Sequence, residues 1–406
     1  MTHGSPVHRP GPAGGGYDAL LLVGFGGPER AEDVMPFLEI VTRGRGVPPE
    51  RLVEVSHHYQ ALGGRSPINE QTRDLQHALQ SEIDRRGMNL PVLWGNRNWD
   101  PFLGRTVAAA AGSGSRRLLA VTTSAYSSYS SCRQYREDLA GALITDDLLG
   151  IVSIDKVRPY FDRPGFLEPV TDAAAVAVTA LLDQGFSPAE LTMVFTTHSI
   201  PTAMADTSGS AALDDHGPGG AYVAQHLAAA GVVAAALTDR VGAIEWQLAY
   251  QSRSGPPAVP WLEPDINDVL GELAGQGRRG VVVVPIGFIS DHVEVVWDLD
   301  NEAAETAAGL GLAFARAATP GTDPRFVAAL VDLIQERCGG FSAAPPATPT
   351  RVRPNFCAPG CCVNLRGRKA TVAGQDSADD QAVAAAANDS SSVSGGRPQA
   401  AAAARA

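Results

Sequence analysis

Short apolar runs that alternate with helical patterns are the feature that most constrains the fold of this chain. The runs predict strands over residues 19–25, 91–94, 117–123, 150–157, 192–197, 244–251 and 280–288, with a weaker one over 312–317. Helical patterns lie between them, over 69–86, 131–143, 169–184, 221–241, 265–276 and 325–337. Strands that alternate with helices are typical of right-handed βαβ units. The sequence therefore predicts an α/β protein with mainly parallel sheets.

The periodic pattern breaks at Arg158–Pro164, which divides the chain into two lobes. We predict a disordered N-terminus over 1–16, a first lobe over 17–160 and a second lobe over 161–319. A C-terminal helical region over 320–341 follows, and then a Pro-, Ala- and Thr-rich linker with a cysteine-rich segment over 342–370. Residues 371–406 have almost no apolar bulk and are expected to form a disordered tail.

Composition favours a soluble cytoplasmic protein. The net charge of −12 and the pI of about 5.2 disfavour general nucleic-acid binding, which needs a basic face. The polar, Gly- and Pro-rich N-terminus does not resemble a signal peptide, and no apolar run is expected to reach membrane-spanning length. The five cysteines of a large cytoplasmic chain indicate metal or redox chemistry more than a disulfide framework.

An acidic segment follows the apolar run that ends near Phe288. If it is helical, Glu294, Asp298 and Glu302 stand four residues apart and drift only about 40° around the axis per step, so the carboxylates share one stripe. Such a stripe suits a cation or a transferred proton, and the alternative is a solvated acidic face. Ligands of open α/β sheets bind at the carboxyl ends of strands, which is where this segment begins.

His198 is the last residue of another strand-like run, and Pro201 ends the pattern. A neutral imidazole that faces carboxylates can bind a borderline metal such as Fe(II) and can accept protons. The alternative is a histidine that is packed and hydrogen-bonded at a strand end. Its pairing with the acidic segment favours the metal or proton role.

Two loops combine glycines with cationic or capping side chains. Arg43 and Arg45 lie among glycines and suit carboxylate or phosphate groups, whereas Ser66 and Asn69 could cap the helix that begins near residue 69. The alternative for each loop is a plain surface turn. Residues 24–29 resemble half of a dinucleotide fingerprint, but the third glycine is missing and a proline removes a donor, so a nicotinamide or flavin site is disfavoured.

Four cysteines could hold a metal cluster. Cys357, Cys361 and Cys362 lie within six residues, and Cys132 stands far upstream at the start of a predicted helix. Together they supply the four thiolates that a [2Fe–2S] cluster needs, if the C-terminal segment folds back. Zinc also takes four thiolates, although the adjacent pair suits two irons better than one ion, and an unliganded tail is the remaining alternative. Cys338 is left as a spare at a helix end.

At these residues the chain resembles the ferrochelatase family, in particular the soluble bacterial type that acts on coproporphyrin III. The resemblance spans roughly residues 19–302, and its specific part is the pair of His198 and Glu294. The matching stretches are Gly26-Gly27-Pro28, residues 63–69, Thr197–Pro201, Tyr250-Gln251-Ser252 with Pro260-Trp261-Leu262, and Asp291–Glu294.

The resemblance implies two Rossmann-like lobes around a porphyrin cleft, and insertion of Fe(II) into coproporphyrin III to give Fe-coproporphyrin III in haem biosynthesis. Protoporphyrin IX as the substrate is the alternative within the family. Less similar alternatives are another tetrapyrrole metal chelatase, a non-catalytic porphyrin- or metal-binding protein, and a cluster-based redox sensor. The implied partners are enzymes that produce the porphyrin upstream and mature the haem downstream, and the implied state is a monomer.

The resemblance also carries roles to single residues. His198 and Glu294 resemble the catalytic pair that handles the metal and the pyrrole protons, and Asp298 and Glu302 resemble an acidic line that leads metal or protons away from it. The cysteine set resembles that of members that bind a [2Fe–2S] cluster. Residues that match porphyrin contacts of bacterial relatives are Arg43, Arg45, His58, Tyr59, Ser66 and Tyr135.

Three features depart from parts of the family. Phe25 stands where some bacterial members have a tyrosine that ligates iron, and Asn98 stands where some have a histidine. Axial ligation from the side of Phe25 is therefore not expected. The chain also lacks the apolar lip of membrane-bound members, which fits a polar tetracarboxylate substrate.

Overall fold

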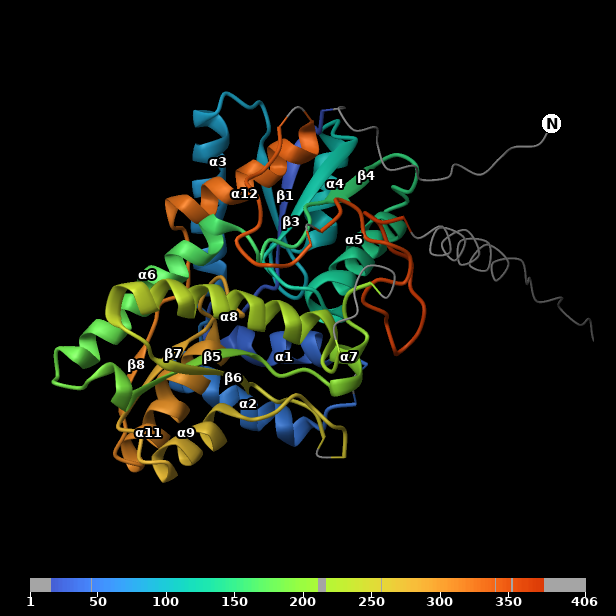
Figure 1. Cartoon of the computed structure of the whole chain (residues 1–406). Helices are drawn as coiled ribbons and strands as arrows, with labels where there is room; N and C mark the ends of the chain where they lie inside the picture. Colours follow the sequence, from blue (N-terminus) through green and yellow to red (C-terminus); the bar gives the residue numbers. More distant parts are fainter. Residues whose placement is uncertain are drawn as a thin grey trace, which may run out of the picture.

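Two four-stranded parallel sheets form the centre of the two lobes (Figure 1). The computed structural model describes residues 16–44, 46–210, 217–256, 258–339, 341–351 and 353–375. Most of the predicted disordered segments 1–16 and 371–406, namely residues 1–15 and 376–406, and also Arg45, lie outside the described residues. The α/β fold with parallel sheets that the sequence predicts is confirmed.

The first sheet has the strand order β2-β1-β3-β4, with every pair parallel. Its strands are β1 (Ala19–Gly24), β2 (Val92–Asn96), β3 (Arg117–Thr122) and β4 (Ser153–Lys156). All six residues of β1 are buried, as expected for a central strand with helices on both faces. Successive side chains of β1 point to opposite faces, so Leu20 and Leu22 join one apolar core and Leu21 and Val23 join another.

Helices cover both faces of the first sheet. On one face lies α3 (Ile68–Arg85), whose Leu75, Leu79 and Ile83 pack in the same core as Leu20. On the other lie α4 (Leu103–Gly112) and α5 (Gln134–Thr145), which follows a π-helical turn, η2 (Tyr129–Arg133). A short 3₁₀ turn, η1 (Ala31–Asp33), leads into α1 (Val34–Thr42) and α2 (Pro49–Ala61), which lie beside the second lobe (Figure 1).

The second sheet has the strand order β6-β5-β7-β8, again all parallel. Its strands are β5 (Leu191–His198), β6 (Glu245–Gln251), β7 (Gly280–Val284) and β8 (Ala313–Arg316). One face packs against α6 (Pro164–Leu182) and α8 (Gly220–Val241), and the other against α9 (Ile266–Gly275) and α11 (Ala304–Gly309). The connections add η3 (Pro188–Glu190) and α7 (Thr202–Asp206).

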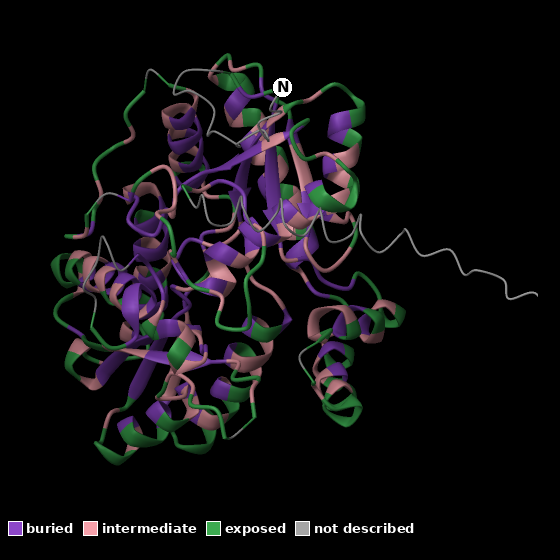
Figure 2. Cartoon of the chain, turned by 90° about the vertical axis from the view of Figure 1, so that its right-hand side faces the viewer, coloured by how far each residue is buried: buried purple, intermediate pink, exposed green. Residues whose placement is uncertain are grey.

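One apolar core extends through both lobes. It joins α3 of the first lobe to α6 and α8 of the second, and the C-terminal helix α12 (Pro324–Cys338) supplies Phe326, Leu330 and Ile334 to it. Figure 2 shows both sheets buried beneath helices that expose their outer faces. Because the lobes share this core, the strand ends of the two sheets are held in a fixed relation.

All eight predicted strands are present within the described residues, whereas the helices were predicted less completely. The sequence patterns did not predict α1, α2, α4, α7 or α11, and α6 begins at Pro164, before the predicted residue 169. Thr371–Gln375, part of the expected tail, is described: Val372 and Ala373 are buried against the first lobe.

The expectation that no segment reaches membrane-spanning length is wrong for two helices. The helices Pro164–Leu182 and Gly220–Val241 have the length and apolar composition that crossing a membrane requires. The physical reason is that both are core helices, about half of whose most apolar stretch is buried inside the protein.

Candidate active site

His198 is the last residue of β5, and its ring faces the side chain of Glu294. Both residues belong to the second lobe. The distance from His198 Nε2 to Glu294 Oε2 is 3.8 Å, and the two side chains are 32% and 47% exposed. On its other side, His198 Nδ1 lies 2.5 Å from the carbonyl oxygen of Ser199. A carbonyl can only accept, so Nδ1 carries a proton, and Nε2 is the ring nitrogen that faces the carboxylate. The pair can therefore hold a cation or accept a proton between its two atoms.

A buried polar network fixes the end of β5. The hydroxyl of Tyr222 in α8 donates to the carbonyl of His198 at 2.8 Å, and the hydroxyl of Thr197 lies 2.9 Å from His226 Nε2. Burial lowers the pKa of His226 to about 3, so this imidazole is neutral, and it stacks on Tyr126 at 3.6 Å between ring centroids. The sequence analysis did not identify this network, because nothing in the sequence pairs α8 with β5.

The acidic segment forms a π-helix rather than the α-helix that we assumed. Val293–Val295 is a short α-helical turn, α10, and Val296–Ala303 is π-helical, η4. Single π-helical stretches are frequent at functional sites because they displace side chains from the α-helical register. Glu294 also lies 3.9 Å from His292 Nδ1, and burial lowers the pKa of His292. Glu294 thus has an imidazole on two sides.

Asp298 is a carboxyl group that titrates near neutral pH. Burial raises its pKa to about 7, and the neighbouring carboxylates of Glu294 and Glu302 add to the rise. Hydrogen bonds from Ser252 and from Gln251, the latter at 3.4 Å, oppose this effect in part. A carboxyl group with this pKa can both accept and release a proton at physiological pH.

Glu302 lies at the far end of the segment, beside the first lobe. Trp297 donates a hydrogen bond from Nε1 to Glu302 Oε1 at 2.7 Å. The same indole stacks on His58 of α2, with ring centroids 4.3 Å apart and planes inclined by 9°. Burial lowers the pKa of His58. The structure therefore brings one of the predicted porphyrin contacts next to the acidic line.

The other predicted porphyrin contacts differ in exposure. Tyr59, Ser66 and Tyr135 are only 7%, 3% and 4% exposed, so they pack beneath the surface. Arg43 lines a pocket of about 480 Å³ at the edge of the first lobe. The guanidinium of Arg97 lies 4.6 Å above the ring centroid of Tyr135 and also faces this pocket.

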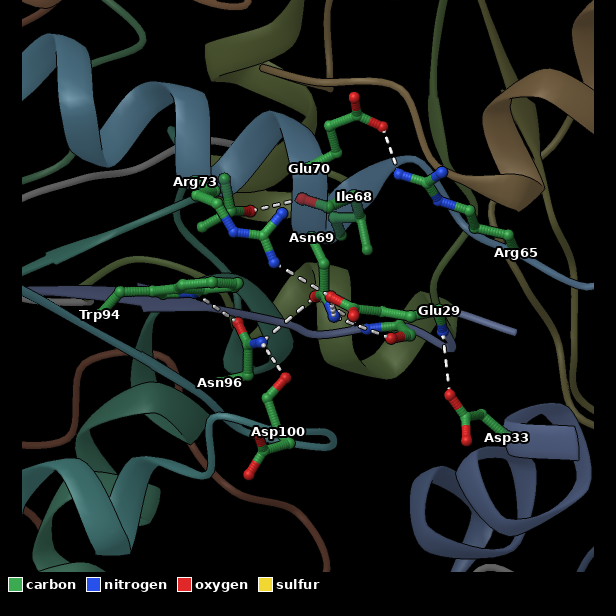
Figure 3. Close-up of polar contacts among 12 residues, drawn as sticks. Glu29, Asp33, Arg65, Ile68, Asn69, Glu70, Arg73, Trp94, Asn96 and Asp100 are labelled. Atoms are coloured by element: carbon green, nitrogen blue, oxygen red, sulfur yellow. Dashed lines mark hydrogen bonds and ion pairs between the residues drawn. The ribbon is translucent and has the colours of Figure 1, made fainter. Parts of the chain in front are cut away.

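The glycine loop after β1 is filled by side chains, as Figure 3 shows. Asn69 accepts from the backbone N–H of Gly27 at 3.2 Å and donates to the carbonyl of Gly27 at 3.0 Å. Asn96 donates to the same Asn69 oxygen at 3.2 Å (Figure 3). A Cβ at Gly27 would lie 2.8 Å from Cβ of Ser66. The backbone N–H of Gly27 is therefore bonded to Asn69 and is not free to bind an anion. Asn69 does not cap α3.

The four predicted cluster cysteines lie together. Thiol contacts link Cys132 of η2 to Cys357 and Cys362, and link Cys361 to Cys357 and Cys362, the last pair with sulfurs 3.8 Å apart. The backbone N–H of Gly209 donates to the sulfur of Cys362 at 3.2 Å. Within the described ranges, no group of three or more His, Cys, Asp or Glu side chains is arranged around a single metal-ion position. The thiols instead form a closed ring of pairwise contacts.

Comparisons with known proteins show the family of this chain. The sequence model of the family described as Ferrochelatase matches residues 17–338. The chain therefore belongs to the ferrochelatase family.

Its relatives include the coproporphyrin III ferrochelatase of Leifsonia xyli, which is 52% identical over 88% of this chain and 94% of that protein. The coproporphyrin III ferrochelatase of Streptomyces coelicolor is 51% identical over 89% of this chain and 97% of that protein. Among solved structures, SirB from Bacillus subtilis with Fe3+ is 12% identical with a TM-score of 0.45, over 79% of this chain and 95% of that chain.

Proposed function

We propose that this protein is a coproporphyrin III ferrochelatase, which inserts Fe(II) into coproporphyrin III to give Fe-coproporphyrin III in haem biosynthesis. The observation that carries the proposal is the 3.8 Å approach of His198 Nε2 to Glu294 Oε2, with Nδ1 on the other side of the ring bonded to the Ser199 carbonyl. About half of the aligned residues are identical in relatives that bear this name, which supports the choice of substrate.

Metal insertion requires two pyrrole protons to leave and the ferrous ion to lose its water. Nε2 of His198 accepts a pyrrole proton or ligates Fe(II), because Nδ1 is already committed to the Ser199 carbonyl. Glu294 supplies a carboxylate ligand or a second base beside it. Both groups are partly exposed, so a porphyrin and an ion can reach them.

Asp298 and Glu302 continue the site along η4. With a pKa of about 7, Asp298 takes a proton from the pair and releases it toward solvent. Glu302 is held by Trp297 at the outer end of the line, where it can receive metal or protons. Asp298 and Glu302 thus form the proposed acidic line for transfer, and both join His198 and Glu294 as proposed metal-handling residues.

The porphyrin occupies the cleft between the lobes in this proposal. His58 and Arg43 are the predicted contacts whose side chains reach accessible surface, and the buried Tyr59, Ser66 and Tyr135 shape the wall behind them. Binding energy from the substrate carboxylates offsets the strain of a puckered macrocycle. Phe25 offers no axial ligand, so ligation of the metal comes from the side of His198.

A [2Fe–2S] cluster is the resident group that the cysteines suit. Cys132, Cys357, Cys361 and Cys362 offer the four thiolates, and the ring of contacts between adjacent cysteines fits two irons better than one ion. The cluster would supply a structural or sensory function, since metal insertion transfers no electron. We place the enzyme in the cytoplasm as a monomer, between enzymes that produce its porphyrin and enzymes that mature its product.

Anaerobic turnover with Fe(II) tests the proposed function. Coproporphyrin III and protoporphyrin IX are offered separately, and formation of the iron porphyrin is followed by absorbance. The expected result is a kcat/KM for coproporphyrin III at least about tenfold above that for protoporphyrin IX, since two additional carboxylates each add charge-assisted hydrogen bonds. Binding of coproporphyrin III without consumption of Fe(II) would instead identify a non-catalytic porphyrin-binding protein.

A further inference from the structure

The segment behind the cysteines, residues 364–369, contributes three cations to one pocket of the first lobe. The pocket has a volume of about 480 Å³ and lies between the end of α1, η2 with the start of α5, and this segment. Its charged lining is cationic except for one carboxylate: Arg43, Arg97, Arg366, Arg368, Lys369 and Asp138.

The three cations of the segment, Arg366, Arg368 and Lys369, are available to a ligand. Arg97 pairs with the single carboxylate, Asp138. Arg366, Arg368 and Lys369 are exposed, and no carboxylate of the described residues pairs with any of them. Like charges that lie close together repel one another, so an anion that binds among these cations relieves their mutual repulsion.

Contacts with α5 hold the segment in place. Asn364 donates from Nδ2 to both carboxylate oxygens of Glu137 at 3.1 Å, and its own Oδ1 accepts from the backbone N–H of Arg366 at 3.0 Å. Farther on, Arg136 donates to the carbonyl of Val372 at 2.7 Å. Anchors on both sides therefore present the basic side chains at a defined position, although the side chains themselves remain exposed.

The pocket borders the wall of the candidate active site. Arg97 lies over the ring of Phe25, with 5.8 Å to its centroid. Phe25 packs in one apolar cluster with Val41, which also lines the pocket, and with Val293, the neighbour of Glu294 in sequence. One apolar cluster therefore connects the lining of the pocket with the neighbour of Glu294.

We propose that Arg366, Arg368 and Lys369 bind carboxylates of the porphyrin substrate, together with Arg43, which lines the same pocket. This inference rests on the proposed function and names a subsite for it. Guanidinium groups suit carboxylates because they donate two parallel hydrogen bonds, and a tetracarboxylate supplies several acceptors at its rim. Because the segment directly follows Cys361 and Cys362, the cysteine segment gains a role in substrate affinity.

A charge-neutral triple variant, R366Q/R368Q/K369Q, tests the proposal in the full-length protein. The readouts are the Kd of metal-free coproporphyrin III, from fluorescence, and kcat and KM for Fe(II) insertion. We expect Kd and KM to rise about tenfold or more while kcat stays within about twofold, because the lost contacts lie away from the reacting nitrogens. The Kd of the wild type should also rise with salt more steeply than that of the variant.

The matched control is R85Q/R240Q/R279Q, which removes the same charge from exposed positions. Arg85 and Arg240 lie in the last turns of α3 and α8, and Arg279 precedes β7, so all three lie at element ends opposite to the active site. This control should keep the wild-type Kd. A Kd of the test variant within about twofold of wild type would overturn the proposal, whereas a wild-type protein without any porphyrin binding would overturn the proposed function itself.

Asn364→Ala separates position from charge. It keeps every cation but removes the two hydrogen bonds to Glu137, so Kd should rise about threefold to tenfold, with an unchanged absorption spectrum of any bound cluster. An unchanged Kd in this variant would show that the segment does not need its anchor and would contradict the positioning role.

Discussion

Replacing Asp298 with Asn should stabilise the protein more at high pH than at low pH. Burial raises the pKa of this carboxyl from 3.8 to about 7, so the native state keeps the proton up to about pH 7 and the unfolded chain loses it near pH 4. The native state binds more protons in this window, and its stability therefore falls as pH rises through it. An amide carries no charge to bury and can still accept from Ser252, so the penalty disappears in the variant.

The size of the effect follows from the pKa difference of about 3, which corresponds to roughly 4 kcal/mol when both states are ionised. About half of this loss of stability develops between pH 5.5 and pH 8.5. In this range the carboxyl is already ionised in the unfolded chain, whereas the native state loses its proton only near pH 7. Partial access of solvent to the group reduces the pH-dependent gain to about 1 kcal/mol, or roughly 2 °C in Tm.

Calorimetry of wild type and D298N at both pH values measures this gain. Asp300→Asn is the control: it removes an exposed carboxylate of the same helix that pairs with Arg316, and its difference from wild type should not grow with pH. A D298N advantage that is the same at both pH values, or larger at pH 5.5, would refute the assignment of a buried, proton-holding carboxyl at this position.

Three further substitutions test the supports of the site and of the C-terminal segment. Tyr222→Phe removes the hydroxyl that donates to the backbone carbonyl of His198, so the free energy of unfolding should fall by about 1–2 kcal/mol in urea and the insertion rate should fall with it. Gly287→Ala would place a Cβ 2.2 Å from Oγ1 and 2.9 Å from Cα of Thr197, so it should cost about 2–3 kcal/mol in the same assay; a change below about 0.5 kcal/mol would contradict this packing. Cys357→Ser should abolish the visible absorption of a [2Fe–2S] cluster and accelerate proteolysis of the C-terminal segment, whereas Cys338→Ser should leave both unchanged.

The strands were predictable from sequence because parallel strands buried on both faces are continuous apolar runs, such as β7 with Gly280–Val284. The missed helices lack such a signal. The polar α2 contains two adjacent histidines and buries only Ser56 and Tyr59, and α1 carries Pro36 within its first turn. Their apolar faces are completed by residues distant in sequence, such as Val293, which a local pattern does not contain.

The sequence predicted candidate residues at strand ends, and the structure brings two of them, His198 and Glu294, within 3.8 Å of each other. His198 and Glu294 were identified because each follows an apolar run at the edge where parallel sheets place ligands. The π-helix of η4 was not predicted, because the α-helical period assumed for the acidic residues is a local average. The supporting network of Tyr222 and His226 was missed as well, since helix α8 meets β5 only through tertiary packing.

We propose that the imidazole of residue 198 and the carboxylate of residue 294, 3.8 Å apart, work as one iron-inserting site. The most direct measurement is single-turnover insertion by His198→Ala, with porphyrin affinity determined on the same sample. The account predicts that the variant binds coproporphyrin III as wild type does and forms no iron porphyrin, with a rate reduced at least about 1,000-fold. Insertion at a rate near that of the wild type would contradict it.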